Sequence, residues 1–454
     1  MPSAAGARPE LPDLAARIAG WARDGEQVEA YVRRSHQTDV RVHEGGIEQL
    51  STAETEGAGI RVVAGHRQGF AWAGSLDDDV LAETLAEARD NADFSSPDEF
   101  LGLAGPDGVE APAIDPYDPE LETFPTSARI DLALDLERRV RAGDGRIRAL
   151  RNTDYGDGLY TTAVATSTGL AAWSRRSVVS LGTTAIAGEG ADTQTGHGYV
   201  CARRPSDLDV ERAATLAVTR STRLLGARKP VSAQLTAVLE PSVAAAFLSV
   251  LAGTLNGESV LKGRSLFVDR LGETVAAPFV SLVEDPGDPT AFTASRYDSE
   301  GLASRRVPLI EAGVLTGFLY DTYSGRRAGT ASTASAVRGG FKGAPTCGHR
   351  AVSLVPGGQS PEEVVAGVEL GLLVQTISGL HSGVNPVSGD FSVGAEGLMI
   401  RHGELAEPVR EITIGSTLQR MLRGVVAVGN DREWLLGPAA HVTLAVSGIS
   451  MSGQ

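Results

Sequence analysis

Residues 28–74, VEAYVRRSHQTDVRVHEGGIEQLSTAETEGAGIRVVAGHRQGFAWAG, decide the fold class. The stretch contains five short runs, each of which ends at glycine or at polar residues, and several of which alternate apolar with polar side chains. Such runs are typical of antiparallel strands joined by tight turns. On either side, residues 11–23 and 76–92 have apolar residues at helical spacing. A helix, a strand meander and a second helix together predict an α+β fold.

The same order of elements recurs further along the chain. A strong amphipathic helix is predicted at 127–143, and strand-like runs and a further helix follow it. Between the two units, residues 94–125 are rich in proline, aspartate and glycine, which predicts a linker or a long surface loop. Residues 1–230 are therefore expected to form an N-terminal α+β domain with antiparallel strand meanders flanked by helices. This domain is either two pseudo-repeats, 1–93 and 127–230, joined by the loop, or one interleaved sheet.

From residue 231 onward the strand-like runs are short and glycine becomes frequent. Two of these runs are expected to be hairpins, one turning at Gly313 and one at His402-Gly403. Helices are expected at 241–252, 361–370 and 415–423. Residues 231–454 are therefore predicted to form a second, mostly β, glycine-rich domain.

Charge, cysteine content and hydropathy restrict the partners and the cellular compartment that we expect for this chain. The 41 Lys and Arg residues against 57 Asp and Glu give a formal charge of −16, which disfavours nucleic acids and anionic membranes as partners. The two cysteines, Cys201 and Cys347, are too few for a disulfide framework. The first residues, MPSAAGARPELPDL, lack the apolar core of a signal peptide, and no apolar run could span a bilayer. We expect a cytoplasmic protein.

The pair His43-Glu44 is the kind of pair that begins a zinc-peptidase motif. Such a motif needs a second histidine one helical turn later, so that both imidazoles reach one metal ion. No histidine follows within five residues, and Gly45-Gly46 instead suits a hairpin turn. The sequence therefore predicts that His43 lies at a strand end on the surface and binds no metal.

A second candidate is TCGHR, residues 346–350. On an extended segment, the side chains of Cys347 and His349 would point to the same side, as metal ligands or as a nucleophile and its base. The chain has neither the Gly-x-Ser-x-Gly elbow of many hydrolases nor a phosphate-binding loop. An independent hydrolase that uses Cys347 and His349 stays open as an alternative, although such pairs are usually incidental.

The C-terminal third carries a more specific signal. The run SGDFSVGAEGLMIRHGELAEPVREITIGSTLQRMLRGVVAVGND, residues 388–431, resembles the TldD/PmbA family, also called the modulator-of-DNA-gyrase family, and specifically its PmbA (TldE) branch. The resemblance extends over nearly the whole chain. The matching segments are Gly389-Asp390-Phe391-Ser392, Gly397, Pro408-Val409, Glu411-Ile412-Thr413-Ile414 and Gly429-Asn430-Asp431.

This resemblance implies where a zinc site would lie. The TldD branch carries His-Glu-x-x-x-His on the helix that opens the C-terminal domain, and a cysteine ligand near the C-terminus. In this chain the three motif positions hold Glu240, Pro241 and Ala245, and residues 430–454 contain no cysteine. The resemblance therefore implies no cofactor and no catalytic residue in this chain, with zinc in a TldD-like catalytic partner.

The family also implies a heterodimer that encloses a proteolytic chamber. Small or unfolded peptides, including peptide natural products during maturation, would be held there as an added β-strand. The glycine-rich strands from 379 to 397 are expected to receive that strand, because glycine permits close backbone approach. An alternative from another functional class is a peptide-binding adaptor protein that has no peptidase partner.

Four residues are candidates for contact with substrate. Asn385, Asp390 and Ser392 lie in the most specific motif and could hydrogen-bond a peptide backbone, although Asn-Pro and Gly-Asp are also ordinary turn residues. Arg305 could recognise a substrate carboxylate. Its alternatives are a solvent-facing position on a strand and an ion pair at a subunit interface.

Overall fold

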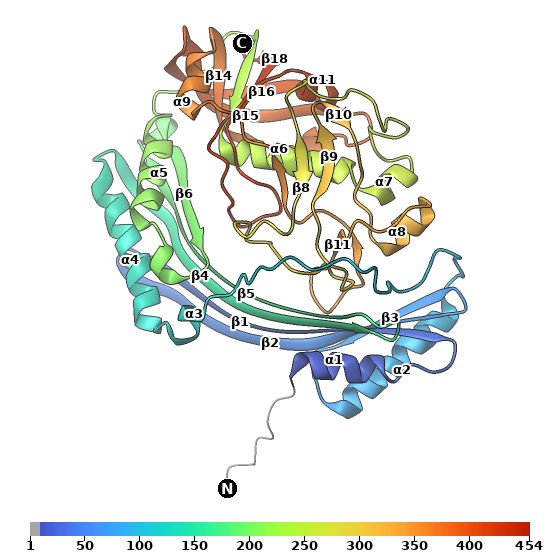
Figure 1. Ribbon diagram of the computed structural model, residues 1–454. Coiled ribbons are helices and arrows are strands. Elements are labelled where there is room, and N and C mark those ends of the chain that lie inside the picture. The colour runs from blue at the N-terminus through green and yellow to red at the C-terminus, as the bar shows by residue number, and fades with distance from the viewer. Residues whose placement is uncertain (1–9) are drawn as a thin grey trace.

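The computed structural model describes residues 10–454. A long curved sheet forms one part of the molecule, and the β-rich C-terminal part lies against its concave face (Figure 1). Residues 1–9, on which the predicted lack of a signal peptide partly rests, lie outside the described residues. No helix within residues 10–454 has the length and apolar character that crossing a membrane requires.

The N-terminal sheet has six antiparallel strands in the order β3-β2-β1-β4-β5-β6. At its centre, β1 pairs with β4 from Glu29↔Thr166 to Val42↔Thr153, so the two units seen in the sequence share one continuous sheet. The units lie side by side in this sheet: the strands of the first unit are on one side of the β1–β4 contact, and those of the second are on the other. The strands are β1 (Glu26–His43), β2 (Gly46–Ala64), β3 (Arg67–Ala73), β4 (Ile147–Thr166), β5 (Ala171–Ala187) and β6 (Gln194–Ala202).

The strands are longer than the sequence pattern predicts, because the five short runs of residues 28–74 belong to only three strands. The polar stretch 35–38 interrupts the apolar alternation, but its backbone pairs with β2 on one side and β4 on the other. The predicted turn is confirmed: His43 pairs with Gly46, and Gly45 has a φ of 76°. His43 lies at this hairpin with its side chain 41% exposed.

Four helices cover the convex face of the sheet (Figure 1). One hydrophobic cluster lies under the first two helices and another lies under the last two. The contact is close because glycines face the helices: a Cβ on Gly69 would lie 1.9 Å from Ala88 O, and one on Gly198 would lie 1.9 Å from Ala213 O. The helices are α1 (Leu11–Ala19), α2 (Asp78–Phe94), α4 (Thr126–Gly143) and α5 (Val210–Thr222).

The predicted loop 94–125 runs between the two parts of the molecule and contains one short helix, α3 (Glu120–Thr123). Its backbone binds both parts. Leu103 N donates to Gln27 Oε1 of β1 at 2.7 Å, and Arg326 Nη2 donates to Leu103 O at 2.7 Å. The segment therefore connects the sheet to the C-terminal part through its own backbone groups.

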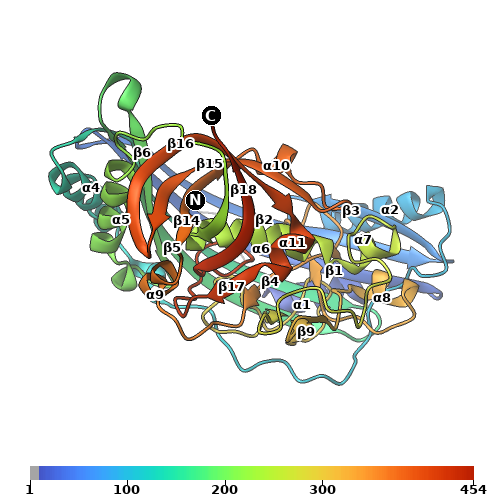
Figure 2. The ribbon, with the colours of Figure 1, turned by 90° about the horizontal axis from the view of Figure 1, so that it is seen from above.

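The C-terminal part is built on a second sheet, in the order β16-β15-β14-β7-β18-β17. A further pairing of β16 with β18 closes five of these strands into a ring, whose curvature is visible in Figure 2. Helix α6 (Pro241–Thr254) packs against this sheet and buries most of its residues. The strands are β7 (Ala233–Leu239), β14 (Leu370–Ser378), β15 (Asp390–Arg401), β16 (Glu404–Thr417), β17 (Val425–Val428) and β18 (Leu444–Ser452).

Both predicted hairpins are confirmed. Ala312 and Gly313 turn between β9 and β10, and His402 and Gly403 turn between β15 and β16, all four with positive φ. The remaining strands are β8 (Leu282–Glu284), β9 (Val307–Glu311), β10 (Val314–Leu315), β11 (Ala336–Val337), β12 (Thr346–Cys347) and β13 (Val352–Leu354). The remaining helices are α7 (Gly257–Leu261), α8 (Thr322–Arg327), α9 (Pro361–Ala366), α10 (Leu380–Gly383), α11 (Leu418–Arg423) and the 3-10 turns Gly190–Asp192 and Pro205–Asp207.

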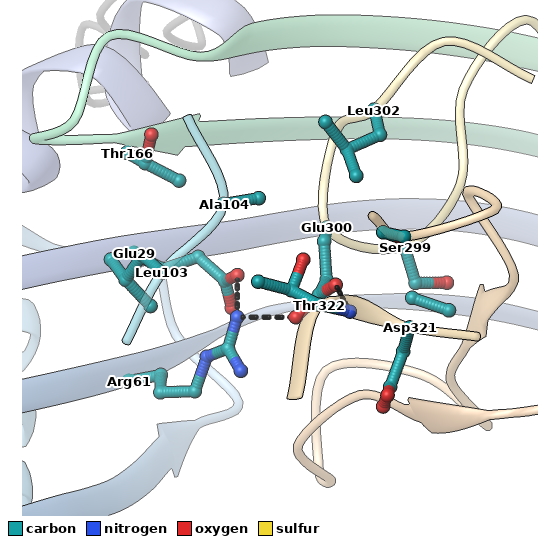
Figure 3. A network of polar contacts seen from close by, with 12 residues as sticks. Glu29, Arg61, Leu103, Ala104, Thr166, Ser299, Glu300, Leu302, Asp321 and Thr322 are labelled. Atoms are coloured by element: carbon teal, nitrogen blue, oxygen red, sulfur yellow. Dashed lines mark hydrogen bonds and ion pairs between the residues drawn. The ribbon is translucent and has the colours of Figure 1, made fainter. Parts of the chain in front are cut away.

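A buried ion network joins the two parts (Figure 3). Arg61 of β2 donates to Glu29 of β1 at 2.5 Å and to Glu300 of the C-terminal part at 3.1 Å. Arg338 also pairs with Glu29, and Thr322 N donates to Glu300 at 2.9 Å. The four charged side chains are at most 6% exposed. Burial opposes ionisation of Glu29, but the two guanidinium groups outweigh it and lower the pKa of Glu29.

Replacing Arg61 by methionine should lower the free energy of unfolding by about 3–5 kcal/mol, because Glu29 and Glu300 would stay buried with less compensation. The matched control is Arg17→Met, since the pair of Arg17 with Asp78 is 46% and 60% exposed. That control should cost no more than about 1 kcal/mol. Denaturant unfolding measures both values, and equally small losses would show that the network does not hold the two parts together.

Candidate functional site

A large cavity, about 1140 Å³, lies where α5 and β6 meet the ring of the C-terminal part. It is lined by side chains from both parts of the molecule. Those used below are His197 of β6, Arg212, Arg220 and Arg223 of or next to α5, Glu240 and Pro241 at the β7–α6 junction, Gln375 and Thr376 of β14, and Asp431, Glu433, His441 and Thr443 of the segment before β18.

The β7–α6 junction is the place where the resemblance implies a zinc motif. Glu240 precedes the helix, and its carbonyl oxygen accepts from Val243 N and Ala244 N, both at 2.9 Å. Pro241 is the first helical residue, a position where the missing N–H costs nothing. Ala245 is buried in the core. The local sequence therefore makes a well-formed helix start that lacks histidine.

Two arginines hold the Glu240 carboxylate. Arg223 Nη2 pairs with Glu240 Oε1, and Arg220 Nη2 lies 3.1 Å from Glu240 Oε2. Gln375 fixes both arginines, since its Oε1 accepts from Arg223 Nε at 2.5 Å and its Nε2 donates to Arg220 O at 2.9 Å. This group is referred to below as the Glu240 cluster: Arg220, Arg223, Glu240 and Gln375.

The residues at this junction do not suit a zinc ion. Glu240 is the one possible ligand at the three motif positions, and two positive guanidinium groups occupy its carboxylate. Across the described residues 10–454, no three His, Cys, Asp or Glu side chains gather as a possible metal site. The Glu240 cluster thus occupies the motif position as an ion-paired structure.

The rest of the cavity wall is also ordered by polar contacts. Arg212 pairs with Glu433, and the Asp431 carboxylate accepts from Thr443 N at 3.0 Å and from Thr443 Oγ1 at 2.7 Å. Burial lowers the pKa of His441, so its imidazole is neutral at pH 7. Asp431 belongs to the family motif Gly429-Asn430-Asp431, which therefore shapes one wall of this cavity.

His197 lies opposite the Glu240 cluster, on β6. Its ring stacks on Tyr199 with centroids 5.9 Å apart, and its carbonyl oxygen accepts from Arg220 Nη1 at 3.1 Å. Burial, and then the nearby charge of Arg220, lower the pKa of His197. The wall therefore combines two imidazoles whose pKa values are lowered by burial with aromatic and aliphatic surface.

Cys347 and His349 have different surroundings. Cys347 is buried in the large C-terminal core, where its Sγ donates to Leu319 O at 3.0 Å, and burial raises its pKa to about 12. His349 lines a separate cavity, and burial lowers its pKa to about 4. A thiol held protonated is a poor nucleophile, so this pair gives no support to an independent hydrolase.

The four predicted substrate-contact residues lie outside the lining of the large cavity. Asn385 Oδ1 accepts from Val387 N at 2.9 Å and from Ser388 N at 3.2 Å, so this side chain closes the turn before β15. Asp390 and Ser392 are exposed on β15, and Asp390 accepts from Ser388 Oγ. Their contact with substrate stays a prediction.

Arg305 pairs with Asp107 of the loop between the two parts, and its Nε donates to Ala303 O at 3.2 Å. An ion pair was one of the alternatives for this residue, but the structure places the pair within the chain. A role in recognising a substrate carboxylate stays a prediction.

The sequence offered two signals for the cavity and missed the rest: one of them is the motif that contains Asp431. Glu240 and Pro241 were singled out through the resemblance. Arg220 and Arg223 have helical i, i+3 spacing, which puts them on one face of a helix, but nothing in the sequence connects them with Gln375, which lies more than 150 positions later.

Comparison with known proteins assigns the chain to a family. Three family models match: PmbA/TldA metallopeptidase domain 1 at residues 28–92, the central domain at 119–225 and the C-terminal domain at 232–453. The chain belongs to the PmbA/TldD metallopeptidase family. A relative from Escherichia coli O157:H7, Metalloprotease PmbA, is 29% identical over 93% of this chain and 91% of its own length.

Solved structures share the fold. A putative modulator of DNA gyrase from Thermotoga maritima superposes with a TM-score of 0.88 at 24% identity, over 97% of this chain and 99% of that one. TldE from Thermococcus kodakarensis superposes with a TM-score of 0.87 at 22% identity, over 94% and 97%. The expected α+β fold with antiparallel sheets is therefore confirmed.

The acid sensitivity of the fold should depend on His349. Its pKa is near 6.5 in the unfolded chain and about 4 in the folded one, so below pH 6.5 the unfolded chain binds more protons. The contribution of His349 to the free energy of unfolding is therefore fully present above pH 6.5 and is lost as the pH falls towards 4. His349→Gln should therefore lose less stability than the wild type across that window.

Urea unfolding at a series of pH values between about 7 and 4 measures this difference. The matched control is His402→Gln, whose side chain is 83% exposed, and its curve should follow the wild type. Identical pH dependence in the His349 variant and the wild type would contradict the buried, neutral state of His349.

Proposed function

We propose that this chain is the subunit without a metal site in a heterodimeric TldD/TldE-type peptidase. A TldD-like partner binds zinc and cleaves small or unfolded peptides, including peptide natural products during maturation, in the cytoplasm. The observation that carries the proposal is the Glu240 cluster: where the metal-binding branch has His, Glu and His, this chain has Glu240, Pro241 and Ala245, with the one carboxylate held by two arginines.

The large cavity supports a role in holding peptides. Beside it, β14 pairs with β7 only through residues 371–374; Gln375 lies at a register shift, and residues 376–378 pair with β15 alone. Thr376, in the segment of β14 that has no partner on its β7 side, is exposed and lines the cavity. A free strand edge can bind an extended peptide through main-chain hydrogen bonds, with little sequence preference.

This edge differs from the place expected from the sequence, the glycine-rich strands from 379 to 397. β15 already has β14 on one side and β16 on the other, so it has no free edge along its paired length. Its glycines serve the chain's own packing: a Cβ on Gly397 would lie 1.9 Å from Leu373 O. We therefore place the added strand at residues 376–378.

Metal content and peptide cleavage test the subunit role. Purified alone, the chain should hold far less than one zinc ion and cleave no unfolded peptide. Purified with a TldD-like partner, the complex should hold about one zinc ion per heterodimer, as a catalytic site requires, and should cleave. A complex made with a partner whose zinc motif has been disabled is the control.

Two outcomes would contradict the subunit role. Stoichiometric zinc in the isolated chain would show that it has a metal site of its own. Peptide binding without any association with a TldD-like chain would favour the adaptor alternative.

Blocking the strand edge tests how peptide is held. In the heterodimer, Thr376→Trp should lower peptide cleavage about tenfold or more, because the bulky ring displaces the peptide from its productive position. Zinc content and heterodimer assembly should not change. Thr413→Trp is the matched control, since Thr413 is an exposed strand threonine outside the cavity lining. Equal activity in both variants would show that peptide does not bind at this edge.

A further inference from the structure

A second cavity, of about 290 Å³, lies between the concave face of the N-terminal sheet and the C-terminal part. Its floor is formed by β1, β4 and β5. The opposite wall is formed by residues 293–299, 337–338 and 349–350. The cavity is separate from the one that holds the Glu240 cluster, and the proposed function does not use it.

The charge in this cavity is opposite in sign to that of the whole chain. Five arginines line it, against one carboxylate, that of Asp298, in a chain of net charge −16. The Asp298 carboxylate is already taken by backbone groups: it accepts from Glu300 N at 2.9 Å, Leu302 N at 3.0 Å and Ala336 N at 3.2 Å. The arginines are Arg33, Arg175, Arg176, Arg338 and Arg350.

Three of these arginines have partners elsewhere. Arg338 pairs with Glu29 in the buried network, and Arg175 pairs with Asp115 at 2.7 Å. Arg350 donates through Nη1 to Tyr297 O at 3.0 Å and through Nη2 to Ala334 O at 2.7 Å. Burial lowers the pKa of Arg350, although two nearby carboxylates oppose that shift.

The other two, Arg33 and Arg176, make no ion pair among residues 10–454. Both guanidinium groups lie over the ring of Tyr160, at 5.1 and 4.9 Å from its centroid. The register explains this placement: Arg176 of β5 lies directly opposite Tyr160 of β4, and Arg33 of β1 lies opposite Thr162. Burial, and then the charge of Arg33, lower the pKa of Arg176.

The cavity also has buried polar nitrogens without a hydrogen-bond partner. Arg175 Nε, Arg338 Nη1, Arg350 Nε and His349 Nε2 are buried without a hydrogen-bond partner, and all four residues line the cavity. The Arg338 side chain is 0% exposed. Buried groups of this kind normally find a partner, and those that do not call for an explanation such as an ion or a ligand.

We propose that this cavity binds a small phosphate-bearing anion, either inorganic phosphate or a phosphate monoester. Arg33 and Arg176 supply two positive charges without a protein counter-ion, and a phosphate group near pH 7 supplies almost two negative ones. Its oxygens accept several hydrogen bonds at once, in the geometry that guanidinium groups recognise. A carboxylate carries one charge and would leave one arginine uncompensated.

Phosphate would contact both parts of the molecule, because Arg33 and Arg176 belong to the sheet while Arg338, His349 and Arg350 belong to the C-terminal part. A ligand that binds the folded state only must raise the unfolding midpoint as its concentration rises. The site therefore predicts a stability that depends on phosphate.

Calorimetric titration and thermal unfolding of the full chain test the proposal, with sodium phosphate against sodium chloride at equal ionic strength. Phosphate should bind and raise the unfolding midpoint, while chloride should not. Arg176→Gln and Arg33→Gln should each weaken phosphate binding about tenfold or more, since each removes hydrogen bonds to a charged group. Arg138→Gln, at a side chain 77% exposed, is the matched control and should bind like the wild type.

A second readout separates binding from a purely structural role. Without phosphate, Arg176→Gln should unfold at the same temperature as the wild type or higher, because it removes a buried charge that lacks a counter-ion. A lower midpoint together with an unchanged phosphate shift would overturn the proposal, since the arginine would then only support the fold.

Phenyl phosphate tests whether the ligand is a phosphate monoester or free phosphate. A peptide with a free C-terminus tests whether the cavity binds a carboxylate instead. Tighter binding of phenyl phosphate than of inorganic phosphate would support a monoester as the ligand, and the reverse would support free phosphate. Binding of the peptide but not of either phosphate would overturn the proposal, as would equal phosphate affinity in the wild type and both arginine variants.

Discussion

The arrangement of the whole molecule depends on charges that are buried between its two parts. Glu29 and Arg61 belong to neighbouring strands of one sheet, while Glu300 and Arg338 belong to the C-terminal part. Each carboxylate is within reach of an arginine, so none of the four has to be neutralised in the interior. A hydrophobic cluster also spans the two parts, with Tyr31 and Val164 of the sheet packed against Phe341 of the C-terminal part. The buried network adds directional ion pairs to this contact. Both cavities depend on how the parts are oriented towards each other, because their walls come from the two parts together.

The two cavities use arginine in opposite ways. In the large cavity, Arg220 and Arg223 both pair with Glu240, so their charge is partly compensated within the protein. This wall therefore presents its shape and the strand edge of β14 to a ligand. In the smaller cavity, Arg33 and Arg176 share only an aromatic ring, so their charge is available to a ligand. Under the proposed function, this chain differs from its zinc-binding partner in the side chains at a helix start.

Much of the fold could be predicted from the sequence, because hydrophobic spacing and turn residues are local. The hairpins at Gly313 and at His402-Gly403, the turn at Gly45 and helix α6 all follow from such signals. Strand length could not be predicted, since the polar stretch 35–38 is kept in β1 by pairing with two neighbours. β18 was missed because Gly448, with a φ of 72°, breaks its alternation where the register shifts.

The candidate site could be predicted only where a motif marks it, at Glu240, Pro241 and Asp431. The side chains that bind Glu240 and hold its arginines come from the end of α5 and from β14. The β14 residue lies far away in sequence, and no local pattern connects it with Glu240.

The position of β7 in its sheet has a consequence for how the chain is made. β7 is completed at Leu239, yet its two neighbours are β14 and β18, which begin at Leu370 and Leu444. During synthesis, both edges of β7 therefore stay unpaired until β14 ends at Ser378, and one edge stays unpaired until β18 follows from Leu444. Bare apolar edges are templates for wrong pairing, and late, long-range pairing is slow. The C-terminal part of this chain is thus a natural client for chaperones until β18 has been synthesised.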